Sequence, residues 1–125
     1  LKNGLNQHRK ISSFFRRGLR MALQKDLIKG LLEFKKIVNK DFPLQKLILF
    51  GSRATKKFKK ESDVDLIIVS SGFNKFDFIE RGAKMYDYWS LPYPVDFLCY
   101  SPKEFSELQK RISIVSEAVK EGVEI

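Results

Sequence analysis

The sequence predicts a single α/β domain, and three observations lead to that prediction. Apolar runs at 47–50, 66–69 and 95–100 have the length and the β-branched and aromatic content of buried strands. Apolar residues at helical spacing precede, separate and follow these runs. With 125 residues, the chain is long enough for one hydrophobic core and too short for two.

The first half of the domain is predicted to be a helix followed by two strands. The helix covers 21–40, and its apolar positions recur every three or four residues: Leu23, Leu27, Leu31, Phe34 and Val38. It ends before Pro43, because proline disfavours helical geometry in the preceding residue. Strands are expected at Leu44–Phe50 and Val64–Ser70, separated by a Gly-Ser turn and a lysine-rich stretch.

The second half is predicted to add helices around one more strand. Residues Phe76–Trp89 suit a helix through apolar positions at helical spacing: Phe78, Ile79, Ala83, Tyr86 and Trp89. A third strand is expected at Val95–Tyr100, after Pro94. Ser101, Pro102 and Glu104 then form the start signal of a helix that runs to Lys110. A last helix is expected at 112–120, ended by Gly122.

The charge of the chain favours an anionic partner. Lys and Arg number 24 against 15 Asp and Glu, which gives a net charge of +9. Nucleotide phosphate, nucleic acid or an acidic protein would suit this charge, although a lysine-rich solvated surface explains it equally well. Residues 1–20 carry six basic residues and no acid, so we expect a basic leader that is peripheral, partly helical or disordered.

The domain itself is expected at 21–125, with Met21 an open possibility for the natural start. Cys99 is the single cysteine and can form no internal disulfide, which favours a reducing, cytoplasmic setting. We expect no secretory signal and no membrane span, because no apolar run has the required length.

Three acids at strand starts are the candidate catalytic residues. Asp63 and Asp65 project from the same side of the second predicted strand, because alternate residues share a face. Two neighbouring carboxylates repel each other unless a cation lies between them, and Mg²⁺ prefers oxygen ligands. If the third strand lies beside the second, Asp96 joins them. Such carboxylates can hold two metal ions for a phosphoryl displacement. As structural alternatives, Asp63 and Asp65 could be a turn cap and an exposed edge acid, and Asp96 could be a strand-end acid paired with a lysine.

The turn before these acids is a candidate phosphate site. Gly51 lets the backbone approach a ligand closely, and the Ser52 hydroxyl can donate to a phosphate oxygen. A helix expected to start at Arg53 would add free N–H groups. Ser52 could also cap that helix, and the two roles are compatible.

These residues resemble a known family signature. Gly51-Ser52, ten residues, and then Asp63-Val64-Asp65 resembles the signature of the polymerase-β-like nucleotidyltransferase superfamily. The small size and the segment from Asp96 to Phe105 look most like the minimal nucleotidyltransferases, often the antitoxin partners of helical HEPN-type proteins. The resemblance covers Met21–Ile125. It implies a small mixed β-sheet flanked by helices, the polymerase-β palm-like fold.

The resemblance also implies roles for the acids. Asp63 and Asp65 would hold two Mg²⁺ ions. Asp96 would ligate one of them and help to deprotonate an acceptor hydroxyl.

The remaining implied roles concern the phosphates and the turn. Gly51 and Ser52 would grip the triphosphate of the nucleotide. Arg53 would start the short helix behind them and could contact a phosphate, and Ser62 would orient the turn before the acids. The lysine-rich stretch at 56–60 departs from the family, which commonly has a mixed-charge, glycine-containing loop there.

The predicted function is Mg²⁺-dependent transfer of a nucleoside monophosphate from a nucleoside triphosphate, with ATP the expected donor, to a hydroxyl. The acceptor is expected on a partner protein, with this chain as the antitoxin of a toxin–antitoxin pair. Because the chain is short, the acceptor pocket is expected to come from a helical HEPN-type partner or from a second copy of the chain. One alternative is a catalytically inactive antitoxin that acts by burying its partner's surface. A basic nucleic-acid-binding protein is a weaker one, since no helix-turn-helix or zinc-ligand spacing supports it.

Overall fold

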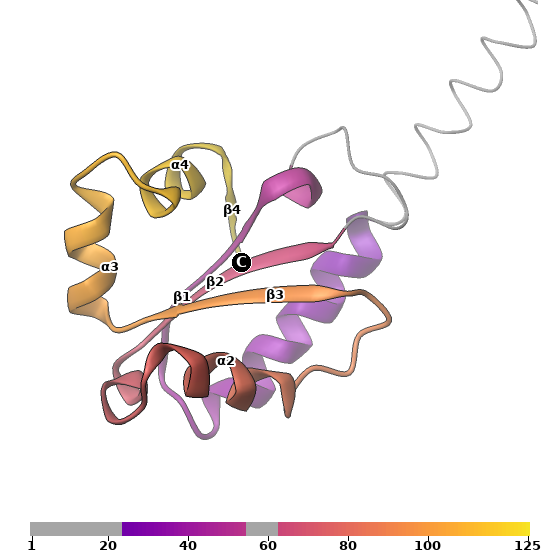
Figure 1. The fold of residues 1–125 in the computed structure, drawn as a ribbon. Coiled ribbons are helices and arrows are strands. Elements are labelled where there is room, and N and C mark those ends of the chain that lie inside the picture. Colours follow the sequence, from indigo (N-terminus) through magenta and orange to yellow (C-terminus); the bar gives the residue numbers. More distant parts are fainter. Residues whose placement is uncertain (1–23, 55–62) are drawn as a thin grey trace, which may run out of the picture.

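The computed structural model describes residues 24–54 and 63–125 (Figure 1). The basic leader at 1–20, the lysines at 56–60 and Ser62 lie outside these residues, and so does the expected helix start at 21. An N-terminal helix is described over 24–39. The elements after it are β1 (Leu44–Phe50), η1 (Gly51–Ala54), β2 (Val64–Ser70), η2 (Ser71–Lys75), α2 (Phe78–Tyr86), β3 (Val95–Tyr100), α3 (Pro102–Gln109), α4 (Ile114–Glu121) and β4 (Val123–Glu124).

The strands form a mixed sheet, which confirms the predicted fold class. Within the described residues its order is β3-β2-β1-β4. β2 runs parallel to β3, whereas β1 runs antiparallel to both β2 and β4. The bounds of β1, β2 and β3 agree with the predicted strands. The register places Asp65 beside Asp96 on one side and beside Phe50 on the other.

One face of the sheet is closed by helices, and we call it the closed face. Alternate residues of the three long strands lie in the main core, including Leu47, Leu49, Leu66 and Ile68. The N-terminal helix and α2 supply the residues that pack against them: Leu27, Leu31, Phe34, Val38 and Met85. The ring of Phe34 contacts Trp89 and Phe97, with centroids 5.2 and 5.8 Å apart.

The opposite face, which we call the open face, is covered only in part. Phe105 of α3 and Val115 of α4 form a second, smaller core with Ile48, Ile67 and Val69 of the sheet. Figure 1 shows α3 and α4 together at one end of the strands. Phe50, Leu98 and Tyr100 are only partly buried. The strand ends that carry the acids therefore remain accessible on this face.

The second helix, α2, is shorter than predicted, and it buries a different face from the predicted one. α2 begins after Asp77. The Asp77 side chain accepts a hydrogen bond from the Glu80 N–H, and the Glu80 carboxylate accepts one from the Asp77 N–H. Its buried residues are Arg81 and Met85. The apolar residues that predict the helix lie mostly outside: Phe78, Ile79 and Tyr86 are exposed.

The last two helices follow their capping signals. The capping box between Ser101 and Glu104 confirms the predicted start of α3. α4 begins at Ile114 rather than Ile112, because Ser113 caps it and Ile112 is 99% exposed. Gly122 ends it as predicted. The short strand β4 after it was not expected. No helix in the described ranges has the length and apolarity needed to cross a membrane.

Candidate active site

The sheet brings two of the three candidate acids side by side. Asp65 and Asp96 are register partners on adjacent parallel strands, so their side chains leave the open face side by side. Asp63 precedes β2 by one residue and is exposed. Burial, followed by the negative charges of Asp96 and Asp63, raises the pKa of the Asp65 carboxyl above its usual value. The Asp65 carboxyl is therefore within electrostatic range of both other acids.

Among the described residues, no ion pair engages the three candidate acids. Within 24–54 and 63–125, the ion pairs join Glu33 to Lys36, Lys46 to Glu124, and Arg81 to Glu104. None of these involves the acids at the start of β2 and β3. Two carboxylates side by side on adjacent strands repel each other, and a cation between them would remove this cost in free energy.

Gly51 is required by the geometry of this site. Its φ is +71°, in the left-handed region that favours glycine. A Cβ at this position would also overlap the Oδ2 atom of Asp65. Glycine therefore allows the turn after β1 to lie directly against the Asp65 carboxylate.

The turn that follows is a 3₁₀ turn over Gly51–Ala54, which includes Arg53, the expected helix start; the continuation at 55–62 lies outside the described residues. Ser52 is exposed on it, where its hydroxyl can meet a ligand. Arg53 is completely buried, and its guanidinium lies 5.0 Å from the centre of the Tyr93 ring. In this position Arg53 anchors the turn to the segment before β3. Its burial gives no support to the expected contact between Arg53 and a phosphate.

The stacking of Arg53 on Tyr93 was missed by sequence reasoning. The available signal is weak: Tyr93 is an aromatic residue between two prolines, Pro92 and Pro94. The pair links the Gly-Ser turn to the start of β3. It thereby holds the turn close to the segment that leads into β3.

The chemistry of the acids suits a hard divalent cation, but their geometry is not that of a finished metal site. Carboxylate oxygens are the ligands that Mg²⁺ prefers, and the raised pKa of Asp65 reflects negative charge that a cation would neutralise. Among the described residues, however, no three His, Cys, Asp or Glu side chains are gathered closely enough to hold a metal. Asp63, Asp65 and Asp96 would have to draw together around an ion.

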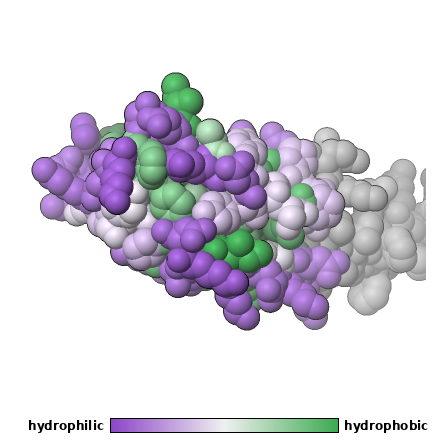
Figure 2. All heavy atoms as spheres, turned by 90° about the horizontal axis from the view of Figure 1, so that it is seen from below, coloured by the Kyte–Doolittle hydropathy of each residue, from purple (hydrophilic) through white to green (hydrophobic). Residues whose placement is uncertain are grey.

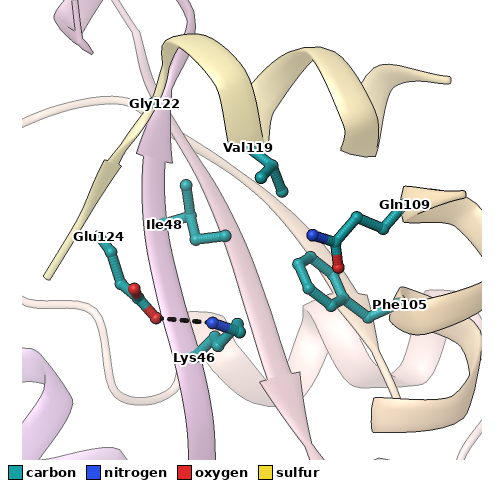
Figure 3. Close-up of a pocket in the computed structure, with 7 residues that line it drawn as sticks. All are labelled: Lys46, Ile48, Phe105, Gln109, Val119, Gly122 and Glu124. Atoms are coloured by element: carbon teal, nitrogen blue, oxygen red, sulfur yellow. Dashed lines mark hydrogen bonds and ion pairs between the residues drawn. The ribbon is translucent and has the colours of Figure 1, made fainter. Parts of the chain in front are cut away.

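A hollow elsewhere on the molecule is drawn in Figure 3. It lies between β1, β4 and the helices α3 and α4, and its lining residues are Lys46, Ile48, Phe105, Gln109, Val119, Gly122 and Glu124. The ion pair of Lys46 and Glu124, with nitrogen and oxygen 3.1 Å apart, neutralises its charged rim. In the register, Lys46 and Ile48 lie beside Val69 and Ile67, further along β2 than Asp65.

The comparison with known protein families agrees with this geometry. Residues 31–121 match the model of the nucleotidyltransferase domain, which covers most of the chain. The chain belongs to this family. No curated protein sequence matches it significantly.

A solved structure shows the same fold. It is the crystal structure, at 1.40 Å resolution, of a Sulfolobus solfataricus protein named provisionally as a nucleotidyltransferase. The two chains are 23% identical, the match covers 84% of each, and the TM-score is 0.62. At this identity the likeness establishes the nucleotidyltransferase fold and nothing finer.

Proposed function

We propose that this nucleotidyltransferase domain transfers a nucleoside monophosphate from a nucleoside triphosphate, with ATP as donor, to a hydroxyl group in a Mg²⁺-dependent reaction. The observation that carries the proposal is the register pair of Asp65 and Asp96 on the open face, with Gly51 directly against Asp65. The turn and the acids are thus in contact, as a site for a metal-bound triphosphate requires.

In the proposed reaction the acids have distinct roles. Asp63, Asp65 and Asp96 would hold two Mg²⁺ ions, which when bound supply positive charge to the phosphates. Asp96 is exposed beside Asp65, and it would accept the proton of the acceptor hydroxyl. The hydroxyl oxygen forms a bond to the α-phosphorus, the bond from that phosphorus to the bridging oxygen breaks, and pyrophosphate leaves.

The turn would hold the triphosphate. Ser52 is exposed and can donate its hydroxyl hydrogen to a phosphate oxygen. Gly51 has no side chain that would keep a phosphate away from the backbone of the turn. Ser62 would orient the segment before Asp63. Arg53 acts from beneath by holding the turn on Tyr93.

We further propose that the acceptor is a hydroxyl on a partner protein in the cytoplasm, with a helical HEPN-type toxin as the partner. The open face supports an external acceptor, because α3 and α4 cover only its far end and the acids stay accessible. The hollow near Lys46 lies away from the acids and offers the acceptor no place beside them.

The test is transfer of label from ATP labelled at the α-phosphate, with Mg²⁺, to the protein alone and to a co-expressed helical partner. We expect acid-precipitable label and an equal release of pyrophosphate. Asp65→Asn and Asp96→Asn should lose both signals. Asp87→Asn changes an exposed aspartate at the end of α2 and should keep them. Equal labelling in all four proteins would contradict the proposal.

A catalytically inactive antitoxin is the second candidate. The observation that favours it is the lack of a ready-made group of three metal-ligating side chains in the described residues. Asp63→Ala and Ser52→Ala separate the candidates. If toxin neutralisation survives both substitutions while nucleotide transfer is lost, then burial of the partner's surface, and not nucleotide transfer, causes the neutralisation.

Nucleic-acid binding receives less support. Residues 24–54 and 63–125 contain equal numbers of acidic and basic residues, so the whole net charge of +9 lies in the segments 1–20 and 56–61. The open face carries acids, which phosphate backbones avoid. Binding through the two basic segments would weaken steeply with salt, and a salt titration with a short duplex tests it.

A further inference from the structure

One short segment on the closed face joins the starts of the two strands that carry the acids. We call residues 89–94 the lead segment, because they lead into β3. The Val64 N–H donates to the Pro94 carbonyl at 2.8 Å. Val64 stands between the first two candidate acids, and Pro94 precedes the third, Asp96, by two residues. The lead segment is therefore bonded to the chain directly beside the acids.

The same segment holds the Gly-Ser turn. Arg53 of η1 is completely buried, and its guanidinium lies over the Tyr93 ring, 5.0 Å from the ring centre. A guanidinium in this position is attracted to the face of the ring. The hydrogen bonds of a 3₁₀ turn have poorer geometry than those of an α-helix, so contacts from outside help to keep η1 in place. Because Gly51 of this turn lies against Asp65, the position of the turn sets the space beside that acid.

The lead segment is itself attached to the N-terminal helix. A Cβ added to Gly30 of that helix would stand 2.7 Å from the Cδ2 atom of Leu91, so Leu91 lies directly on the helix backbone. The Trp89 indole N–H donates to the Tyr93 carbonyl at 3.0 Å, and the Trp89 ring packs edge-on against Phe34. The backbone of Tyr93 is thus held by the core, and its ring is a fixed support for what lies on it.

We propose that Tyr93 is a positioning residue of the candidate site, which keeps the Gly51–Ala54 turn in place beside the acids by holding Arg53. The inference rests on the proposed function for the identity of the ligand, a metal-bound nucleoside triphosphate. Tyr93 acts through Arg53 and contacts no ligand itself. The turn that would grip the triphosphate and the strand starts that carry the acids are attached to the same six residues, so the turn can shift away from the acids only if the contact with Tyr93 breaks.

The ring of Tyr93 makes the contact with Arg53, and this determines the variants for the tests. Tyr93→Leu removes the ring, whereas Tyr93→Phe keeps the ring and removes only the hydroxyl. Phe42→Leu is the matched control. It also replaces a partly buried aromatic residue of the main core by leucine, but it lies before β1, at the opposite end of that strand from Gly51.

The position of Tyr93 at the margin of the core lets these variants fold. Trp89, Leu91 and Tyr93 are partly buried and pack against the main core. Figure 2 shows that apolar residues reach a mainly hydrophilic surface in separate patches on the side seen from below. Thermal melting verifies that each variant is folded. Tyr93→Met, with a flexible side chain that adapts to irregular gaps, takes the place of Tyr93→Leu if leucine prevents folding.

The first measurement is NMR relaxation of the full chain without nucleotide or metal, which gives the backbone order parameters of residues 51–54. We expect values of about 0.85 in the wild type, Tyr93→Phe and Phe42→Leu, and values below about 0.6 in Tyr93→Leu. A turn that is equally ordered in Tyr93→Leu overturns the proposal. Because no ligand is present, this result does not depend on the proposed function.

The second measurement is calorimetric titration of ATP with Mg²⁺ into the same four proteins. We expect Kd to rise by roughly tenfold or more in Tyr93→Leu, because a small displacement of groups that hold a ligand is costly. Tyr93→Phe and Phe42→Leu should bind as the wild type does. Wild-type affinity in Tyr93→Leu, or an equal loss in Phe42→Leu, contradicts the positioning role. A wild type that binds no ATP contradicts the proposed function instead, and the order parameters then decide whether Tyr93 holds the turn.

Discussion

The two faces of the sheet use the same strands for different purposes. On the closed face, Leu47, Leu66 and Ile68 are fully buried under the N-terminal helix and α2. On the open face, α3 and α4 cover Ile67 and Val69 but leave Asp65 at the strand start accessible. Val64 and Asp65 are adjacent in sequence, yet one is core and the other belongs to the site. Because successive residues of a strand point to opposite faces of the sheet, neighbouring residues of β2 serve the core and the candidate site in turn.

Truncating one leucine on each face gives the largest expected effect. Leu66 is fully buried on the closed face, so Leu66→Ala should destabilise the fold by about 2–5 kcal/mol. Leu98 is a partly buried residue of the open face, and Leu98→Ala should cost clearly less. Chemical denaturation of both variants measures the difference. Equal losses would mean that the open face is as well packed as the closed one.

A second comparison uses two glycines. Gly51→Ala forces a side chain into a left-handed turn and against the Asp65 carboxylate, and it should cost about 1–3 kcal/mol. Gly82→Ala adds a Cβ in open space within α2 and should stabilise the fold by up to about 1 kcal/mol. Thermal melting at low protein concentration measures both. A stabilised Gly51→Ala variant would show that the turn does not press on Asp65.

The smallest expected effect concerns the charge of Asp65. Its raised pKa means that the folded state holds this proton more tightly than the unfolded state. The stabilising contribution of the protonated form is complete below about pH 4 and is lost as pH rises through the folded pKa. Asp65→Asn should therefore raise Tm by a few degrees at neutral pH without metal, and this gain should vanish in acid. Asp87→Asn is the control, and a gain that is independent of pH would exclude charge as the cause.

Much of the fold followed from local sequence signals. The strand bounds could be predicted because apolar runs were bounded by Gly, Ser and Pro, and the start of α3 because Ser101 and Glu104 form a capping box. The orientation of α2 could not, since Arg81 turns inward to donate to the carbonyls of Phe73 and Phe76 and to Glu104. Such bonds depend on segments brought together only by folding.

The candidate site divides in the same way. Alternation along β2 is a local signal and predicted that Asp63 and Asp65 share a side of the strand. That Asp96 lies beside Asp65 depends on the pairing of β2 with β3, which the residues alone left conditional. The place of Arg53 was not predictable, since its burial depends on Tyr93, forty residues later. Local patterns therefore identified the residues that face solvent better than those that support them.

The most direct test of the central proposal is calorimetric titration of ATP into the purified protein, with and without Mg²⁺, using the wild type, Asp65→Asn and Asp87→Asn. We predict Mg²⁺-dependent binding to the wild type and to Asp87→Asn, and none to Asp65→Asn. Binding that persists in Asp65→Asn, or that does not require Mg²⁺, would contradict a nucleotide site built on the acids of the open face.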